Sequence, residues 1–527
     1  MRDLIVAVDI GTGSARAGVF DRSGAMLARA EHPIAINQPC ENHAEHDSED
    51  IWRAVCIAVR EAREAAGIAA GRVAALGFDA TCSLVVRDRD GGPLAVSGGK
   101  DPRWDTIVWF DHRALAEADF CTATGHPLLA HSGRVMSPEM QMPKLMWLKR
   151  HQSQQWTKVG YVFDLADFMT WKATGSLGRS RCTITAKWNY MAHEQDGWCE
   201  DFLAEIGLED LRERGSLPKE TLPVGTAVGR LTAQAAAELG LDTGCVVGPG
   251  MIDAYAGVLG VLGGFLGDCG RLERQLALIG GTSSCVAALS REKKFGFGMW
   301  GPYYEVVLPG HWLVEGGQSA TGALLDHIVR LHSAGGDPVA AIHQRIVTRI
   351  GELREKEGDD FASRLHVLPD FHGNRSPLAD PHGLGVISGL SLDASFDGLC
   401  RLYWKACLAI VLGIRHVIEK LGEGGYALEA LHVTGGHLRN PLLMEIYKDV
   451  TGCKLVVPRT SDAVLLGTAM AAAVTGGLYA NLASAGDHMY PGGTEYLPDP
   501  LKRALYDREY RRFLAMYRHR DELERIA

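Results

Sequence analysis

The stretch that most constrains the fold is Leu4–Arg16, which reads LIVAVDIGTGSAR. Its first residues are apolar and partly β-branched, which is typical of a buried strand. The strand ends at Asp9, and residues 11–14 (GTGS) form a tight turn with many free backbone N–H groups. Because glycine has no side chain to keep a ligand away, such a turn can lie against an anion. An ordinary β-hairpin with a solvated Asp9 is the alternative.

A second stretch repeats this design. The apolar run 277–279 leads into GGTSS at residues 280–284, and apolar residues return at 285–289. A plain hairpin is again the alternative, but two such hairpins in one chain favour an internal duplication of one fold unit. We therefore expect two domains, each with one anion-binding turn.

A lone acid follows a third strand. Residues 245–247 are apolar, and GPGMIDAYAG at 248–257 places Asp253 between a glycine turn and a helix of small residues. A buried carboxylate is costly unless it serves a purpose. Asp253 is therefore the strongest candidate for a general base in the chain.

Other polar residues follow predicted strands. Small hydroxyl residues interrupt a strand at 79–83, a place where α/β proteins tend to put ligand contacts. Asp111 and Arg113 could hydrogen-bond adjacent hydroxyls of a polyol, or form a structural salt bridge. Lys187, in a loop-like stretch at 186–189, is a candidate ligand contact or simply solvated. The glycine pair at 435–436 precedes a helix, where a nucleotide can lie on exposed backbone.

Composition limits the class of protein. The chain has 527 residues, 46% of them hydrophobic, and a net charge of -10, which argues against binding to nucleic acid or an anionic membrane. The most apolar stretch, 245–266, contains Asp253 and many glycines and would span a membrane poorly. Twelve scattered cysteines without a CxxC motif fit reduced thiols in a cytoplasm. The polar loop 42–50 matches no metal-ligand spacing and indicates a helix start.

Motifs spread over nearly the whole chain resemble, in order and spacing, those of the FGGY family of carbohydrate kinases. They are DIGTGSAR at 9–16, WFDHR at 109–113, PKLMWL at 143–148, GMIDAYAG at 250–257, GGTSS at 280–284, GGQSATG at 316–322 and TGGHLRNP at 434–441. In addition, TCSLV at 81–85 resembles the D-ribulokinase branch of the pentulose kinases. The sequence EHD at 45–47 departs from the family pattern, in which glutamine is more usual than histidine, so we assign that loop no role.

The resemblance implies an α/β fold of two ribonuclease H-like domains, of the actin/hexokinase superfamily, that flank a cleft. The sugar-binding domain would span residues 1–266 and the ATP-binding domain residues 267–527. It implies Asp253 as catalytic base and sugar contact. Further sugar contacts would be Thr81, Cys82, Asp111, Arg113, Lys187 and Glu315. The nucleotide and its phosphates would contact Asp9, Gly11, Thr12, Gly13, Ser14, Arg16, Gly281, Thr282, Ser283, Gly435, Gly436 and Asn440, with Asp9 also holding Mg²⁺, directly or through water.

The activity implied is transfer of a phosphoryl group from ATP to the terminal hydroxyl of a ketopentose, with D-ribulose as the expected substrate. An L-ribulose, D-xylulose or polyol kinase is the alternative within the family. A non-catalytic, actin-like nucleotide-binding protein is a more distant one. The expected partners are the sugar, ATP and Mg²⁺, with no nucleic acid and no membrane; the location is cytoplasmic, and a homodimer is left open.

Overall fold

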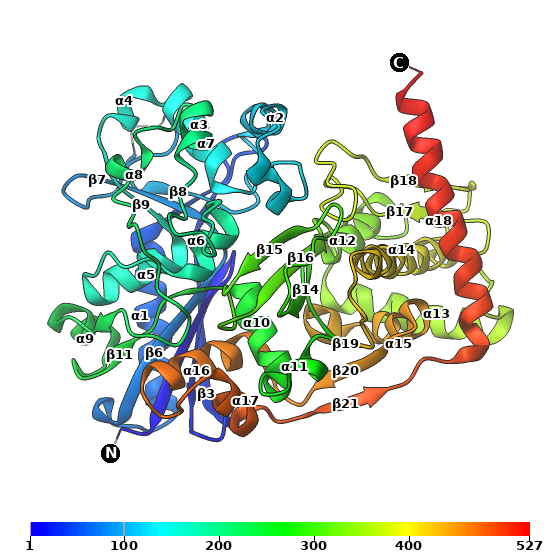
Figure 1. Ribbon diagram of the computed structural model, residues 1–527. Coiled ribbons are helices and arrows are strands. Elements are labelled where there is room, and N and C mark those ends of the chain that lie inside the picture. Colours follow the sequence, from blue (N-terminus) through cyan, green and yellow to red (C-terminus); the bar gives the residue numbers. More distant parts are fainter. Residues whose placement is uncertain (1, 99–100, 527) are drawn as a thin grey trace.

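The computed structural model describes residues 2–98 and 101–526. Two seven-stranded sheets lie side by side, one in each half of the chain (Figure 1). The N-terminal half also carries a five-stranded sheet, and residues 366–368 and 386–388 form a two-stranded sheet in the C-terminal half. This arrangement confirms the predicted two-domain α/β architecture.

The first sheet contains the opening hairpin of the chain. Its strands are β1 (Leu4–Ile10), β2 (Ser14–Phe20), β3 (Met26–Pro33), β6 (Val73–Ala80), β10 (Gly229–Arg230), β11 (Val246–Val247) and β12 (Met251–Ile252). Strands β1, β2 and β3 pair antiparallel, whereas β6 pairs parallel to β1.

Strand β1 is buried on both faces, which explains its nearly continuous apolar sequence. Val6, Val8 and Ile10 pack in the same cluster as helix α1 (Ser48–Ala65), whereas Ile5 and Ala7 pack with helix α16 (Ala463–Thr475). Because side chains alternate along a strand, Asp9 lies on the α16 face. This alternation directs the only carboxylate of the strand toward the second domain.

The second sheet repeats the first. Its strands are β13 (Gln275–Gly280), β14 (Ser284–Ser290), β15 (Trp300–Tyr304), β16 (Trp312–Gln318), β19 (Ala430–Gly435), β20 (Lys454–Pro458) and β21 (Gly493–Tyr496). Strands β13, β14 and β16 pair antiparallel, and β19 pairs parallel to β13. The pairing matches that of β1, β2, β3 and β6, so the predicted duplication is confirmed.

Helices cover both sheets. Those of the N-terminal half include α2 (Leu115–Ala123), α3 (Gln141–His151), α5 (Leu165–Thr174), α6 (Arg181–Lys187), α9 (Ala233–Leu239) and α10 (Asp253–Leu262). Those of the C-terminal half include α12 (Gly322–Leu331), α13 (Ala340–Glu357), α14 (Phe396–Glu423), α15 (Pro441–Thr451), α17 (Leu482–Met489) and α18 (Arg503–Glu524). None of the helices in the described part of the chain is both long and apolar enough to cross a membrane.

The five-stranded sheet and its loops correct two details of the sequence analysis. Its strands are β4 (Ile36–Asn37), β5 (Glu45–Asp47), β7 (Leu84–Asp88), β8 (Trp104–Ile107) and β9 (Val159–Asp164). The stretch at 42–50 is partly a strand, and Asp47 then caps α1, as a helix start predicts. Lys187 is not in a loop but is the last residue of α6, because that short helix is capped by Ser180 and its buried face packs into the core.

Helices α10 and α16 cross between the two sheets at very short distance. A Cβ atom added to Gly260 of α10 would come within 1.8 Å of the backbone oxygen of Ala463. A Cβ added to Gly467 of α16 would lie 1.8 Å from the oxygen of Ala256. Although α16 belongs to the second half of the chain, it packs on the first sheet, as the orange helix beside the blue strands in Figure 1 shows.

We expect Gly467→Ala to destabilise the protein by about 1–3 kcal/mol, because the added methyl group forces the two helix backbones apart. Gly351→Ala is a matched control, since a Cβ at this position in α13 would meet no atom within 4 Å. Replacing a glycine in a helix interior should leave stability unchanged or raise it. Thermal unfolding measures both variants, and equal melting temperatures for the two would contradict the expectation.

Candidate active site

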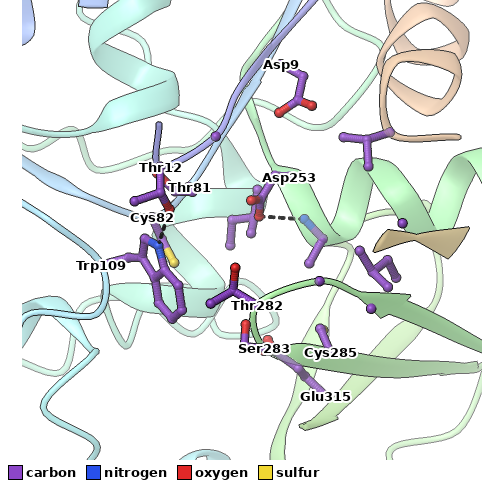
Figure 2. Close-up of a pocket in the computed structure, with 18 of the residues that line it drawn as sticks. Asp9, Thr12, Thr81, Cys82, Trp109, Asp253, Thr282, Ser283, Cys285 and Glu315 are labelled. Atoms are coloured by element: carbon purple, nitrogen blue, oxygen red, sulfur yellow. Dashed lines mark hydrogen bonds between the residues drawn. The ribbon is translucent and has the colours of Figure 1, made fainter. Parts of the chain in front are cut away.

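A cavity of about 310 Å³ lies between the two domains. Figure 2 shows Asp253 between Asp9 and the turn that bears Thr282. Most of the residues predicted for the site meet here. The cavity is lined by the predicted residues Asp9, Gly11, Thr12, Arg16, Thr81, Cys82, Lys187, Asp253, Gly281, Thr282, Ser283, Glu315, Gly435 and Gly436.

The two hairpin turns face the same cavity from different domains. The N–H of Gly11 donates to the oxygen of Ser14 over 3.0 Å, and the N–H of Gly281 donates to the oxygen of Ser283 over 2.8 Å. The turns differ by one residue in length, since Ile10 pairs with Ala15 whereas Gly280 pairs with Ser284. The cavity therefore has a glycine-rich turn on each side, as the duplication predicts.

Asp9 is a buried carboxyl group at the end of β1. Its side chain is 2% exposed, and its Oδ2 lies 3.1 Å from Nη1 of Arg16. Burial raises the pKa of Asp9 from its usual 3.8 to about 7, although the guanidinium of Arg16 acts in the opposite direction. The site thus contains a carboxyl group whose pKa is near neutral. A cation bound in the cavity would lower this pKa and favour the ionised form.

Asp253 is the first residue of α10 and lines the cavity. Its Oδ1 accepts a 2.6 Å hydrogen bond from the N–H of Ala254, so the helix N-terminus orients the side chain. Burial raises the pKa of Asp253 above its usual value, which makes the carboxylate a stronger base. The geometry suits acceptance of a proton from a group in the cavity.

Lys187 and Glu315 join the two domains across the cavity. Lys187 Nζ lies 3.2 Å from Oε2 of Glu315 in β16, and the hydroxyl of Tyr255 donates to the same oxygen over 2.7 Å. The ammonium also lies 4.3 Å from the centre of the Trp300 ring. Although burial lowers the pKa of Lys187, the charge of Glu315 raises it above its usual value. The Lys187 ammonium therefore stays charged, and it can donate hydrogen bonds to hydroxyl groups in the cavity.

A second cavity of about 570 Å³ lies within the C-terminal domain. It shares Gly281, Thr282 and Gly436 with the first, so the two spaces meet at the second glycine turn. Asn440 lines it and caps α15, with its Oδ1 accepting from the N–H of Leu442. Asn440, predicted as a nucleotide contact, thus lines the second cavity together with Gly281, Thr282 and Gly436, and not the first.

Four predicted residues lie outside both cavities. Gly13 accepts from Ile34, and the Ser14 hydroxyl donates to Glu31 over 2.7 Å. Asp111 and Arg113 form the pair that the sequence predicts, at 2.8 and 2.9 Å. Their remaining groups bond Ala44, Glu45 and Val96 instead of facing the cavity. The geometry therefore supports the structural salt bridge that was the alternative to a sugar contact.

The cavity also contains residues that sequence reasoning missed. Trp109, Glu139, Trp300 and Arg375 line it. Trp109 Nε1 donates to the Thr12 hydroxyl over 3.0 Å and so connects the first turn to the segment that follows β8 in the same domain. Arg375 is in a turn-rich stretch, FHGNRSP, whose only signal was a lone charge among turn residues. Such a signal does not distinguish a solvated arginine from a buried one.

Comparison with known proteins places these features in a family. Residues 4–260 match the N-terminal domain, and residues 276–476 the C-terminal domain, of the FGGY family of carbohydrate kinases. The chain belongs to this family. An FGGY carbohydrate kinase domain-containing protein of Danio rerio is 43% identical over 98% of both chains.

Two further relatives of this FGGY kinase are informative. A D-ribulokinase of Saccharomyces cerevisiae is 37% identical over 88% of this chain and 71% of that protein. A solved structure of xylulose kinase from Rhodospirillum rubrum superposes with a TM-score of 0.80 at 24% identity, covering 99% of each chain. The fold is therefore that of the FGGY kinases, and the protein is a carbohydrate kinase.

We expect Asp9→Asn to stabilise this kinase at alkaline pH. A carboxyl group with a raised folded-state pKa favours the folded state at low pH, and that stability is lost as pH rises from 3.8 toward 7. Asparagine cannot ionise and avoids the loss. The gain over wild type should be near zero at about pH 4 and on the order of 4 kcal/mol at about pH 8, since each unit of pKa difference is worth about 1.4 kcal/mol. Denaturant unfolding at both pH values measures it, with the exposed Asp521→Asn as control. An equal difference at the two pH values would contradict the expectation.

Proposed function

We propose that the protein is a D-ribulokinase, which transfers the γ-phosphoryl group of ATP to the terminal hydroxyl of D-ribulose and forms D-ribulose 5-phosphate. The observation that carries the proposal is the position of Asp253 at a cavity bordered by both glycine turns. The choice of D-ribulose is supported by the D-ribulokinase of Saccharomyces cerevisiae at 37% identity. We also propose a cytoplasmic location, supported by twelve cysteines that are all free thiols.

Asp253 acts as the general base in this proposal. Its carboxylate accepts the proton of the terminal hydroxyl as the oxygen attacks the γ-phosphorus, and the bond from that phosphorus to the bridging oxygen of ADP breaks. The raised pKa of Asp253 brings the carboxylate closer to neutral pH, where proton transfer is more effective. Lys187 and Glu315 hydrogen-bond hydroxyl groups of the sugar and orient it.

The glycine turns bind the phosphates. The backbone N–H groups of Thr12, Thr282 and Ser283, in the parts of the turns that line the cavity, donate to phosphate oxygens. Positioning with charge stabilisation does most of the work in phosphoryl transfer. The second cavity, which contains Asn440 and opens from the same turn, accommodates the nucleoside. Because the first cavity lies between two domains, closure around sugar and nucleotide excludes water that would otherwise hydrolyse ATP.

The residues present fit a magnesium ion. Mg²⁺ is held by one or two carboxylates together with phosphate oxygens and water, and Asp9 is a cavity-lining carboxyl group whose ion-pair partner among the described residues is Arg16. Asp9 would hold the ion, directly or through water. When bound, Mg²⁺ supplies positive charge that neutralises the phosphate oxygens. No cluster of three or more histidine, cysteine or acidic groups suited to a metal occurs within the described ranges.

A substrate panel tests the activity. We expect ADP release coupled to sugar phosphate formation with D-ribulose, at a higher kcat/KM than with L-ribulose, D-xylulose or pentitols. Mass spectrometry identifies the product. A higher kcat/KM for another sugar would replace D-ribulose with that acceptor, and sugar-independent ATP turnover without a phosphorylated product would indicate an actin-like nucleotide-binding protein instead.

Substitution of Asp253 tests the mechanism. Asp253→Asn should lower kcat by about 10²–10⁴-fold, because the amide cannot accept the proton, while ATP affinity changes little. Stopped assays give kcat, and calorimetric titration gives ATP affinity. Asp521→Asn, at an exposed position of α18, is the control that should keep wild-type activity. Near-wild-type turnover of Asp253→Asn would remove the residue from this role.

A further inference from the structure

A second ion pair joins the domains near the pair of Lys187 and Glu315, since both Lys187 and Arg375 lie against the ring of Trp300. Arg375, from a C-terminal-domain loop, donates from Nη2 to both carboxylate oxygens of Glu139, over 2.9 and 3.2 Å. The two side chains are 7% and 9% exposed and line the same cavity as Lys187. No predicted role accounts for either residue, so this pair requires an explanation of its own.

The ion pair with Glu139 leaves some hydrogen-bond donors of the Arg375 guanidinium without an acceptor. Within residues 2–98 and 101–526, neither Nη1 nor Nε of Arg375 has a hydrogen-bond partner, and Nε is completely buried. The guanidinium lies 5.2 Å from the Trp300 ring centre and 5.9 Å from that of Trp109, so indole rings restrict its position. Nε is closed off from the cavity, whereas Nη1 is not among the fully buried atoms, so Nη1 is the donor that an oxygen atom in the cavity can reach.

The loop that carries Arg375 is fixed to its own domain. The neighbouring Asn374 donates to Asp370 over 2.9 Å and to the Tyr517 hydroxyl over 3.0 Å, and Arg520 of α18 donates to Asp370 over 2.8 Å. The backbone at Arg375 is therefore fixed by the C-terminal domain, whereas Glu139 and Trp109, which contact its guanidinium, belong to the N-terminal domain. Opening of the domains would separate Arg375 from Glu139.

The surroundings favour a neutral polyol over a charged ligand. Around Arg375, the cavity pairs two cations, Arg375 and Lys187, with two carboxylates, Glu139 and Glu315. An anionic ligand would meet both carboxylates at short range, whereas hydroxyl and carbonyl oxygens can accept from the free donors without that repulsion. The rings of Trp109 and Trp300, which line the cavity near the guanidinium, provide an apolar surface for the C–H faces of a sugar.

We propose that Arg375 is an acceptor-binding residue supplied by the C-terminal domain: its Nη1 donates to an oxygen of the sugar, and Glu139 positions the guanidinium for this contact. The inference rests on the proposed function, since it takes the ketopentose as the ligand. It makes the acceptor itself a bridge between the domains, so that sugar binding favours the closed state in which the phosphoryl transfer occurs.

The test uses the full chain with the acceptor that the wild type phosphorylates. Arg375→Met should lower kcat/KM for the sugar by roughly 10- to 100-fold, because a hydrogen bond to a charged donor is lost, while KM for ATP stays within about threefold. Glu139→Gln should cost less, since Arg375 still lines the cavity. Arg511→Met, at an exposed position of α18, is the matched control and should behave as wild type.

Substrate analogues distinguish a direct contact of Arg375 with the sugar from an ion pair that only holds the two domains together. Among ketopentose analogues that each lack one oxygen, at least one should be penalised by the wild type and not by Arg375→Met. Quenching of tryptophan fluorescence by the sugar gives an independent binding curve, because Trp109 and Trp300 flank Arg375. If Arg375→Met does not fold, as judged by circular dichroism, Arg375→Lys keeps the charge but changes the donor geometry, and it should show the same loss of discrimination.

The outcomes distinguish this inference from the proposed function. If the wild type phosphorylates no ketopentose, the proposed function and the inference fail together. If it does, then wild-type kcat/KM in Arg375→Met contradicts the inference alone. Equal losses of kcat/KM in Arg375→Met and Glu139→Gln, uniform over all analogues, would mean that the ion pair only holds the domains together without contacting the sugar. That result would also overturn the inference.

Discussion

The crossing of α10 and α16 is the contact on which the site depends. Gly260 and Gly467 let the two helix backbones meet at a distance that any side chain would prevent. Helix α16 packs on the first sheet, and helix α10 contacts β13 of the second sheet. The contact between the two helices therefore fixes how the two sheets face each other. Since Asp253 begins α10, the same contact sets the position of the proposed base relative to both glycine turns.

Charge burial is the second constraint. Asp9 and Asp253 are both carboxyl groups that burial makes harder to ionise, and Arg16 offsets only part of this at Asp9. A structure selected for stability alone would not keep them. Buried carboxyl groups of this kind are typical of functional sites, where the charges of a phosphate–metal complex and of a transferred proton offset the cost of their burial.

Much of the fold could be predicted from the sequence, because local patterns determine it. The two apolar hairpins with glycine turns identified the duplication, and the lone Asp253 between turn and helix was visible as an unpaired acid. The Asp111–Arg113 pair was predicted as a contact between neighbours, but sequence spacing does not tell which way a pair faces. Glu139 and Arg375 could not be predicted together, since 236 residues separate them and only the domain arrangement brings them into contact.

The anchoring of the Arg375 loop has a consequence for the last helix. Asp370 is bonded by Arg520 and Tyr517, so the far end of α18 supports a wall of the cavity although it is remote from the catalytic motifs in sequence. Figure 1 shows α18 along the outer edge of the C-terminal domain. A fusion partner or truncation near this helix would therefore disturb the cavity wall that carries Arg375 before it disturbed the two glycine turns.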